Sequence, residues 1–237
     1  MRITKDQFLY QLTFLPRVFP VNCYLVEEED SLTLIDAALP YSWKGIIKAA
    51  GQIGKPITRM ILTHGHGDHL GALDTLKGQL SDVRVYISVR DARLMKGDKS
   101  LDPDEPGEAI RGDIPKNLKT VPDVLLQEGE TVGSLLAISA PGHTPGSMVF
   151  LDQRTNSMIA GDAFQTRGGI AVAGQLRPAF PFPAWGTWDK SAALNSAIKL
   201  AEYKPSLLAV GHGEMIAQPE DAIADAIRKA EKNLRNY

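Results

Sequence analysis

Residues 63–69, with the sequence Thr-His-Gly-His-Gly-Asp-His, constrain the fold of this chain more than any other stretch. Four of its side chains can bind a metal ion: His64, His66, Asp68 and His69. The apolar run 59–62 comes directly before them and predicts the end of a buried strand. The two glycines let the backbone turn tightly enough for the imidazoles to converge, whereas residues two apart on a helix face different ways. We therefore predict a ligand loop at the carboxyl end of a strand, with a helix beginning near Asp68.

The remaining two of the five histidines, His143 and His212, stand in glycine-flanked segments that also follow apolar runs. No histidine occurs anywhere else in the chain. Surface turns often carry histidine, but this distribution favours one shared metal site. Imidazole and carboxylate ligands together suit zinc, and also iron or manganese.

These motifs resemble the metallo-β-lactamase superfamily of metal-dependent hydrolases. The family motif His-X-His-X-Asp-His matches residues 64–69, and the later histidines of the family match His143 and His212. Its bridging aspartate matches Asp162, and its aspartate after an early strand matches Asp36. The matches spread over nearly the whole chain. The resemblance implies an α/β fold, the four-layer αββα sandwich, and a site for two metal ions.

Seven candidate ligands are too many for one tetrahedral ion and fit two ions that share a carboxylate. The resemblance implies the following sets: His64, His66 and His143 for one ion, Asp68, His69 and His212 for the other, and Asp162 as the bridge. We expect two Zn²⁺ ions, with Fe or Mn as alternatives, and a bridging hydroxide as the nucleophile. Asp68 is the predicted catalytic residue, because it would accept a hydrogen bond from this hydroxide. Asp36 either orients a ligand histidine or caps a turn.

The composition predicts one soluble domain over residues 1–237, a length that layered α/β domains often reach. With 26 basic and 28 acidic residues, the chain has no nucleic-acid footprint. Its start has no secretory-type apolar run, no span approaches membrane length, and the single cysteine, Cys23, excludes an internal disulfide. We therefore predict a cytoplasmic protein that acts on a small molecule, away from nucleic acid and membranes, and leave its oligomeric state open.

Apolar runs bounded by turn residues predict these strands: 8–14, 22–27, 32–36, 59–62, 83–87, 135–141, 148–152, 157–163 and 207–210. Helical periodicity predicts helices after Pro40, over 89–95, after Trp188 and at the carboxyl terminus. The order strand, aspartate, helix, strand and histidine occurs twice, ending first at His66 and then at His212. This repetition predicts two pseudo-symmetric halves that meet at the metal site.

Two long segments are candidates for the walls of a substrate pocket. Residues 96–123 are rich in proline, glycine and charge, and such an insertion either covers a site or forms a solvated loop. Residues 164–188 leave directly from a predicted metal ligand, and their aromatic rings either line a small-molecule pocket or pin the loop to the core. The predicted substrate-binding residues are Arg167, Arg177, Phe180, Phe182 and Trp185. The two arginines would either hold an anionic group or, as lone arginines usually do, lie on the surface.

Within the superfamily, the ligand set resembles that of the hydroxyacylglutathione hydrolases and the lactonase-like branch. The true β-lactamases typically have cysteine at the place of Asp162 and lack a histidine at the place of His69, and flavodiiron oxygen reductases have glutamate at the place of His66. We therefore predict a dinuclear zinc hydrolase of a small ester, thioester or lactone. The alternatives are a phosphodiesterase that uses the same two metals, a mononuclear iron dioxygenase, and a non-enzymatic binding module.

Overall fold

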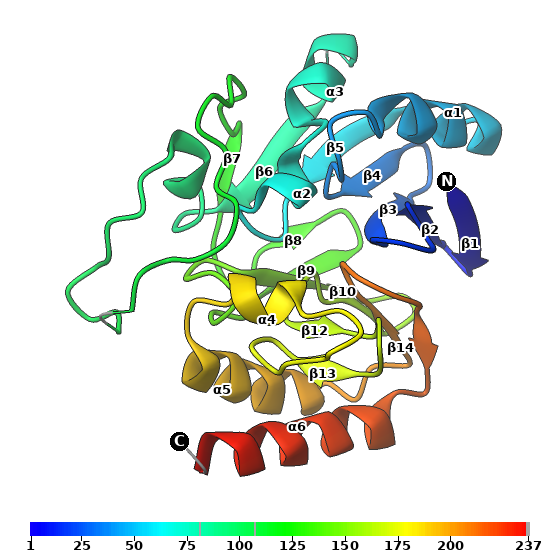
Figure 1. Cartoon of the computed structure of the whole chain (residues 1–237). Helices are drawn as coiled ribbons and strands as arrows, with labels where there is room; N and C mark the ends of the chain where they lie inside the picture. Colours follow the sequence, from blue (N-terminus) through cyan, green and yellow to red (C-terminus); the bar gives the residue numbers. More distant parts are fainter. Residues whose placement is uncertain (81, 107, 236–237) are drawn as a thin grey trace.

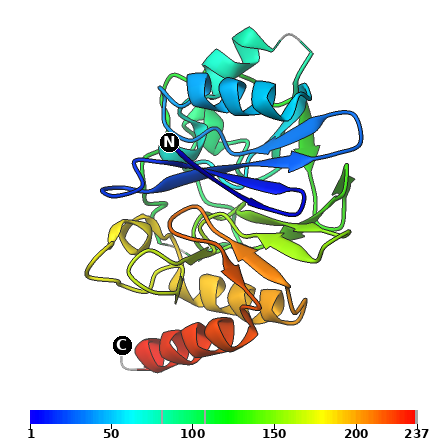
Figure 2. The same cartoon turned by 90° about the vertical axis from the view of Figure 1, so that its right-hand side faces the viewer.

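The computed structural model describes residues 1–80, 82–106 and 108–235, which fold into four layers (Figures 1 and 2). Two mixed β-sheets pack face to face, and helices cover the outer face of each sheet. The prediction of an α/β fold of the αββα type is confirmed.

The first sheet, in the described part of the chain, has seven strands that lie in sequence order. They are β1 (Arg2–Asp6), β2 (Leu9–Phe14), β3 (Val21–Glu27), β4 (Leu32–Ile35), β5 (Ile57–Ile61), β6 (Arg84–Ser88) and β7 (Val124–Leu126). Strands β1 to β4 pair antiparallel, and β4 to β7 pair parallel. The helices on this side are α1 (Trp43–Ile53), α2 (Gly67–Leu70) and α3 (Leu73–Gln79).

The second sheet has six strands among the described residues, in the order β15-β14-β11-β10-β9-β8. Their bounds are β8 (Thr131–Val132), β9 (Leu135–Ser139), β10 (Met148–Asp152), β11 (Ser157–Ile159), β14 (Leu207–Ala209) and β15 (Ile216–Ala217). Only β11 and β14 pair parallel within it. The remaining elements are the small hairpin of β12 (Phe164–Gln165) and β13 (Ala171–Val172), and the helices α4 (Phe182–Gly186), α5 (Lys190–Ala201) and α6 (Glu220–Arg235).

Three apolar clusters hold the layers together. Ile46 of α1 belongs to the cluster between the first sheet and its helices, and Ile223 of α6 belongs to the matching cluster under the second sheet. The central cluster joins the two sheets through side chains such as Ile61 and Phe150. Each fully buried side chain of this size contributes roughly 1.5–3 kcal/mol relative to its exposed state. The buried face between the sheets therefore fixes their relative position, and with it the loops at their edges.

The two halves repeat the same order of parts. Strands β4 and β5 are parallel neighbours joined through α1, and β11 and β14 are parallel neighbours joined through α5. Asp36 follows β4 and Asp162 follows β11, while ligand loops with histidine follow β5 and β14. Because β9 runs in the same direction as β11, the loop with His143 reaches the same edge. The candidate ligands therefore all stand at carboxyl ends of strands.

Some predicted elements differ from the structure. Strand β1 was not predicted, because it is a polar edge strand with exposed side chains. The predicted helix over 89–95 is wrong for its first residues, which form turns; only a 3₁₀ turn, Leu94–Lys96, is present. Among the described residues, no helix combines the length and the apolar composition that crossing a membrane requires.

Candidate metal centre

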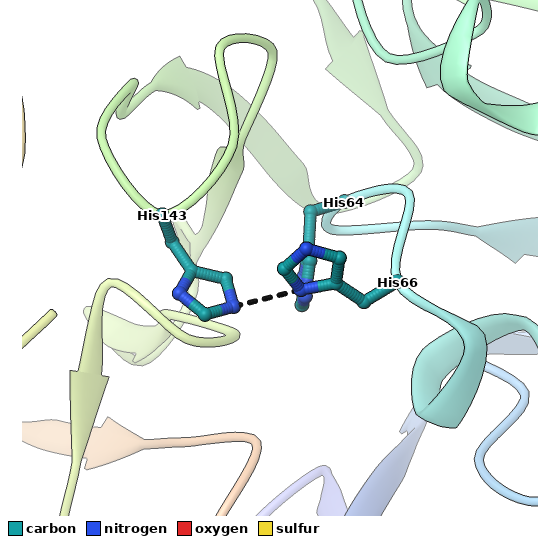
Figure 3. A group of neighbouring side chains, drawn as sticks. All are labelled: His64, His66 and His143. Atoms are coloured by element: carbon teal, nitrogen blue, oxygen red, sulfur yellow. Dashed lines mark hydrogen bonds between the residues drawn. The ribbon is translucent and has the colours of Figure 1, made fainter. Parts of the chain in front are cut away.

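The seven side chains predicted as metal ligands come together where the two sheets meet. Their ligand atoms form three overlapping groups, each within 4.8 Å: His64, His66 and His143; His64, His69 and Asp162; and Asp68, His69 and His212. All except Asp68 are buried. Figure 3 shows the first group, which joins two residues of the β5–α2 loop to His143 from the second half.

The β5–α2 loop is attached to both sheets. Its Thr63 carbonyl oxygen accepts a hydrogen bond of 2.8 Å from the Met148 backbone N–H of β10. His66 adopts an extended backbone at the N-cap of α2, and Asp68 and His69 lie in that short helix. The change from extended to helical backbone explains how residues so close in sequence turn their side chains toward two different ligand groups.

Two of the imidazoles donate to backbone carbonyl groups. His66 Nε2 lies 3.0 Å from the Arg111 carbonyl oxygen, and His212 Nδ1 lies 2.7 Å from the Pro20 carbonyl oxygen. A carbonyl oxygen only accepts hydrogen bonds, so these ring nitrogens carry the proton. When each ring is neutral, its other nitrogen is a lone-pair donor to a metal, which is the arrangement of metal-binding histidines.

Asp36 orients two of the histidines. Its Oδ2 lies 2.8 Å from His69 Nδ1 and 2.8 Å from Thr63 Oγ1, and its Oδ1 accepts from the Thr63 backbone N–H at 2.8 Å. Because Thr63 donates its hydroxyl proton to Asp36, its oxygen accepts from His64 Nδ1 at 3.0 Å. Asp36 has a φ of 62°, which costs roughly 1 kcal/mol for a residue with a side chain. It thus positions His69 directly and His64 through Thr63.

His66 and His143 face each other with two acceptor nitrogens. His143 Nδ1 donates to Thr187 Oγ1 at 3.1 Å, because that hydroxyl gives its own proton to the Pro183 carbonyl oxygen at 2.7 Å. The inner atoms, His66 Nδ1 and His143 Nε2, are then both unprotonated and lie 2.9 Å apart (Figure 3). Burial lowers the pKa of His66 and brings the pKa of His143 down to about 3. A shared proton is therefore disfavoured, and a cation between the rings relieves the repulsion.

Three further buried ligand atoms lack hydrogen-bond partners. Of the described residues, none pairs with His64 Nε2, His69 Nε2 or Asp162 Oδ1. The last two approach within 3.4 Å of each other, but they are not aligned for a hydrogen bond. Buried polar atoms are nearly always paired, and one left unpaired costs about 1–3 kcal/mol. Imidazole nitrogens and carboxylate oxygens left open in this way fit metal ions of the zinc, iron or manganese type.

The second ligand group carries more negative charge than the first. His212 Nε2 lies 3.4 Å from Asp68 Oδ2 and 3.2 Å from Asp162 Oδ2. Burial opposes the charged imidazole, but these carboxylates outweigh it and raise the pKa of His212 to about 10. The same balance of burial against Asp162 and other carboxylates raises the pKa of His69 well above its usual value. Without a cation these histidines are protonated, so a metal ion there replaces protons.

The loop that carries His212 is joined to the first sheet. The Asn22 Nδ2 amide donates to the carbonyl oxygens of Val210 and Gly213, each at 2.8 Å. The Tyr24 hydroxyl donates to the Val210 carbonyl oxygen at 2.6 Å. These buried bonds hold a ligand loop of the second half against β3 of the first.

Asp91 was missed by sequence analysis, although it connects two ligand loops. Its Oδ2 accepts from the Gly65 backbone N–H at 2.9 Å and from Thr144 Oγ1 at 2.6 Å, and its Oδ1 accepts from the Gly146 N–H at 2.8 Å. Burial raises the pKa of its carboxyl group to about 6 despite these bonds. Its position in the sequence could have identified it, because it comes just after β6, next to the strands whose ends carry candidate ligands.

A cavity of about 390 Å³ opens over the ligands and includes five of the seven in its lining. Phe19, Phe182 and Trp185 form its aromatic wall. Phe180, also predicted for the pocket, is buried behind this wall, with ring centroids 5.1 Å from Phe19 and 5.2 Å from His212. The segment 164–188 therefore brings part of its aromatic set to the cavity.

The 96–123 segment, green at the left of Figure 1, reaches the same cavity. Its Gly112 and Asp113 belong to the cavity lining. Ile114 packs in an apolar cluster with Trp188, whose Nε1 donates to the Glu108 carbonyl oxygen at 2.7 Å. Gly112 and Asp113 therefore line the cavity, whereas residues 96–100 of the same segment are exposed.

The two arginines predicted to hold an anionic group lie elsewhere. Arg167 Nη2 donates to the Arg17 carbonyl oxygen at 2.9 Å, and the Arg177 guanidinium donates to the Ile170 carbonyl oxygen. Neither belongs to the cavity lining, and Arg177 lines a separate depression beside α6.

The comparisons with known proteins agree with this geometry. The family model described as the metallo-β-lactamase superfamily matches residues 16–212. The chain is 59% identical over 232 residues to the uncharacterized protein YobT of Bacillus subtilis strain 168, covering 98% of this chain and 100% of that protein. It is 31% identical over 213 residues to the probable metallo-hydrolase YflN of the same organism, covering 81% and 80% of the two chains.

Among solved structures, the chain is similar to TTHA1623 in a di-iron-bound form, with 27% identity and a TM-score of 0.65. The superposition covers 90% of this chain and 96% of that one.

Proposed function

This chain belongs to the metallo-β-lactamase superfamily, and from that premise we propose that it is a dinuclear zinc hydrolase of a small ester, thioester or lactone. The observation that carries the proposal is the pair of acceptor nitrogens, His66 Nδ1 and His143 Nε2, which face each other at 2.9 Å. The name of YflN, a probable metallo-hydrolase, supports hydrolysis. Because the similar protein TTHA1623 was solved in a di-iron-bound form, iron is the alternative metal in this proposal.

In the proposed reaction, two ions held by the seven ligands would supply an activated water and polarise a carbonyl oxygen. Asp68 has a double role. Its Oδ2 faces His212, while its side chain remains 26% exposed and lines the cavity. In this proposal its second oxygen would accept a hydrogen bond from an attacking water and orient it.

The proposed substrate is small and partly apolar. A cavity of about 390 Å³ is at the lower end of the size range of small-molecule sites. Phe182 and Trp185 offer apolar surface next to the ligands, so an aliphatic or aromatic acyl group packs there while its carbonyl lies over the metal site. We propose a small molecule as the partner, rather than nucleic acid, since the formal net charge is −2.

Metal analysis of protein purified without added metal tests the first part of the proposal. Two zinc ions per chain are expected. A single iron per chain would favour the dioxygenase alternative, and no metal would favour a binding module.

A substrate panel tests the second part. Zinc-loaded protein is assayed on lactones, thioesters, phosphodiesters and penicillins, and turnover of the first two classes with weak or no penicillin hydrolysis is expected. Trp185→Ala should lose the preference among acyl groups while keeping both metals. Tyr41→Ala is the matched control, because Tyr41 is similarly exposed but lies outside the cavity lining. Phosphodiesters as the sole class turned over would overturn the proposal.

A further inference from the structure

Asp113 is a carboxylate at the cavity that no ligand role explains. Its backbone carbonyl oxygen accepts a hydrogen bond of 2.7 Å from the Gly67 N–H, and the next side chain, Ile114, is buried. On its other side Gly112 packs against His66, where an added Cβ would lie 2.2 Å from Nε2. Neighbours on both sides thus hold Asp113 at the cavity, although its own side chain is exposed.

The carboxylate of Asp113 lies over the β5–α2 loop. A Cβ added at Gly67 would come within 2.5 Å of Asp113 Oδ2, so the carboxylate occupies the space that the missing side chain leaves between His66 and Asp68. No residue of the described ranges donates a hydrogen bond to this carboxylate or forms an ion pair with it. It is therefore a charged acceptor, next to the metal ligands, that remains available to a ligand.

Trp185 stands on the neighbouring part of the cavity wall. Helix α4 and the 96–123 segment meet over His66, since a Cβ added at Gly186 would lie 3.6 Å from His66 Cε1 and 3.9 Å from the Gly112 Cα. Trp185 precedes Gly186 and Asp113 follows Gly112, and both belong to the cavity lining. The Trp185 side chain is 63% exposed, so its ring is open to a bound molecule.

The described lining residues around Asp113 include no lysine or arginine. His212, which also belongs to the lining, faces the carboxylates of Asp68 and Asp162. A carboxylate and an exposed tryptophan ring that line one cavity are the combination that recognises ammonium groups, through charge attraction and the cation–π interaction. We propose that the substrate carries a protonated amine or quaternary ammonium group that binds between Asp113 and Trp185, while its scissile carbonyl lies over the metal ligands. The placement of the scissile carbonyl over the metal ligands rests on the proposed function.

Kinetics with matched substrates test the charge preference. Three aromatic acyl thioesters differ only in the para substituent: aminomethyl, which is cationic, ethyl, which is neutral, and carboxymethyl, which is anionic. We expect the highest kcat/KM for the cationic member. In Asp113→Asn its advantage over the neutral member should fall roughly twofold to fivefold, the range of one exposed ion or cation–π contact. Asp104→Asn, on the same segment but outside the cavity lining, is the control and should leave the ratio unchanged.

A binding measurement separates this inference from the proposed hydrolysis. Benzyltrimethylammonium and neutral benzyl alcohol are titrated into the metal-loaded protein, and binding is followed by tryptophan fluorescence and by ligand-observed NMR. The ammonium compound should bind more tightly, and its advantage should shrink in both Asp113→Asn and Trp185→Ala.

The outcomes are distinguishable. If no ester, thioester or lactone is hydrolysed but ammonium binding depends on Asp113, the proposed function fails and the ammonium site stands. If neutral thioesters are hydrolysed while Asp113→Asn changes neither the substrate ratio nor ammonium binding, the ammonium site is overturned and the hydrolase stands. A preference for the anionic thioester would also overturn it.

Discussion

The imidazole of His66 donates a hydrogen bond from Nε2 to the carbonyl oxygen of Arg111 across 3.0 Å. The two residues are 45 positions apart in sequence, and Arg111 belongs to the 96–123 segment. This bond leaves Nδ1 of His66 free to face His143. A segment that carries none of the candidate ligands therefore sets the orientation of one of them.

The first prediction concerns Gly112, which touches the same ring. Gly112→Ala should displace His66 and weaken the affinity for the first metal ion by about tenfold to a hundredfold, as loss of a supporting contact does in other metal sites. Gly129→Ala is the matched control, because Gly129 has a φ of 86° against 84° for Gly112, while nothing lies within 4 Å of its added Cβ. Chelator competition measures the affinities. Equal losses in both variants would assign the effect to backbone strain alone.

The second prediction concerns Asp36. Asparagine tolerates the left-handed backbone that Asp36 adopts, so Asp36→Asn changes the hydrogen bonds without adding strain. We expect the affinity for both metal ions to fall, because Asp36 supports His69 of one ligand group and, through Thr63, His64 of the other. The measurement is stepwise metal binding by titration calorimetry. If the variant loses affinity only for the ion bound by His69, the proposed support of His64 by Asp36 through Thr63 is wrong.

The third prediction concerns Asp91. The carboxylate of Asp91 accepts hydrogen bonds from backbone N–H groups of both loops. In Asp91→Asn, an amide NH₂ group would face one of these N–H donors and repel it, so the β5–α2 loop and the loop of His143 should separate slightly. We expect weaker binding of the first ion and a loss of about 1–3 kcal/mol in the free energy of unfolding. Asp152→Asn is the control, since Asp152 is equally buried but pairs with Arg154, away from the ligands. Unchanged binding of the first ion in Asp91→Asn would refute the positioning role.

The fourth prediction concerns the number of protons released when each metal ion binds. Burial lowers the pKa values of His66 and His143, so the first ion meets neutral imidazoles at pH 7 and releases few protons. Carboxylates hold the pKa of His212 near 10 against the effect of burial, so this ring is protonated at pH 7 and the second ion must displace its proton. Affinity for the second ion should therefore rise with pH across the neutral range, while affinity for the first stays flat. Calorimetry in buffers of different ionisation enthalpy counts the protons, and equal release at both steps would contradict the assignment.

The fifth prediction concerns Asp68. Asp68→Asn should abolish tight binding of the second ion and lower turnover by several orders of magnitude, because we propose that the same carboxylate orients the attacking water. The first ion should remain, since its ligands are three histidines. Metal content and single-substrate kinetics on the same preparation check both statements. Loss of both ions together, or unchanged turnover, would speak against the two-site assignment.

The candidate ligands and one of their supports, Asp36, were predictable from the sequence, and the other supports were not. His143 and His212 stand between glycines after apolar strands, a local pattern that a sequence displays directly. Asp91 has no such pattern: its importance comes from burial and from bonds to Gly65 and Gly146, which only the folded chain brings together. The same holds for Thr63, whose hydroxyl relays between Asp36 and His64.

The cavity walls were predictable only in part. The prediction that residues 164–188 reach the cavity agrees with the places of Phe182 and Trp185, but Arg167 and Arg177 point to carbonyl groups away from it. Nearness along the chain did not translate into nearness in space, because Arg167 lies in the turn between β12 and β13 and Arg177 follows that hairpin. Side-chain direction in a loop follows from tertiary contacts that periodicity does not encode.

The hydrogen bonds from Asn22 hold the loop of His212 against the first sheet. The candidate ligands of the two halves are therefore close together before a metal ion binds. Each outer candidate ligand group, that of His143 and that of His212, draws on both halves of the chain, so an ion bound there would join the halves. Asn22 belongs to none of these groups, yet its loss would leave the halves less well placed to bind such an ion. Protein without metal would have its halves less firmly joined, and would therefore be cleaved more readily by proteases.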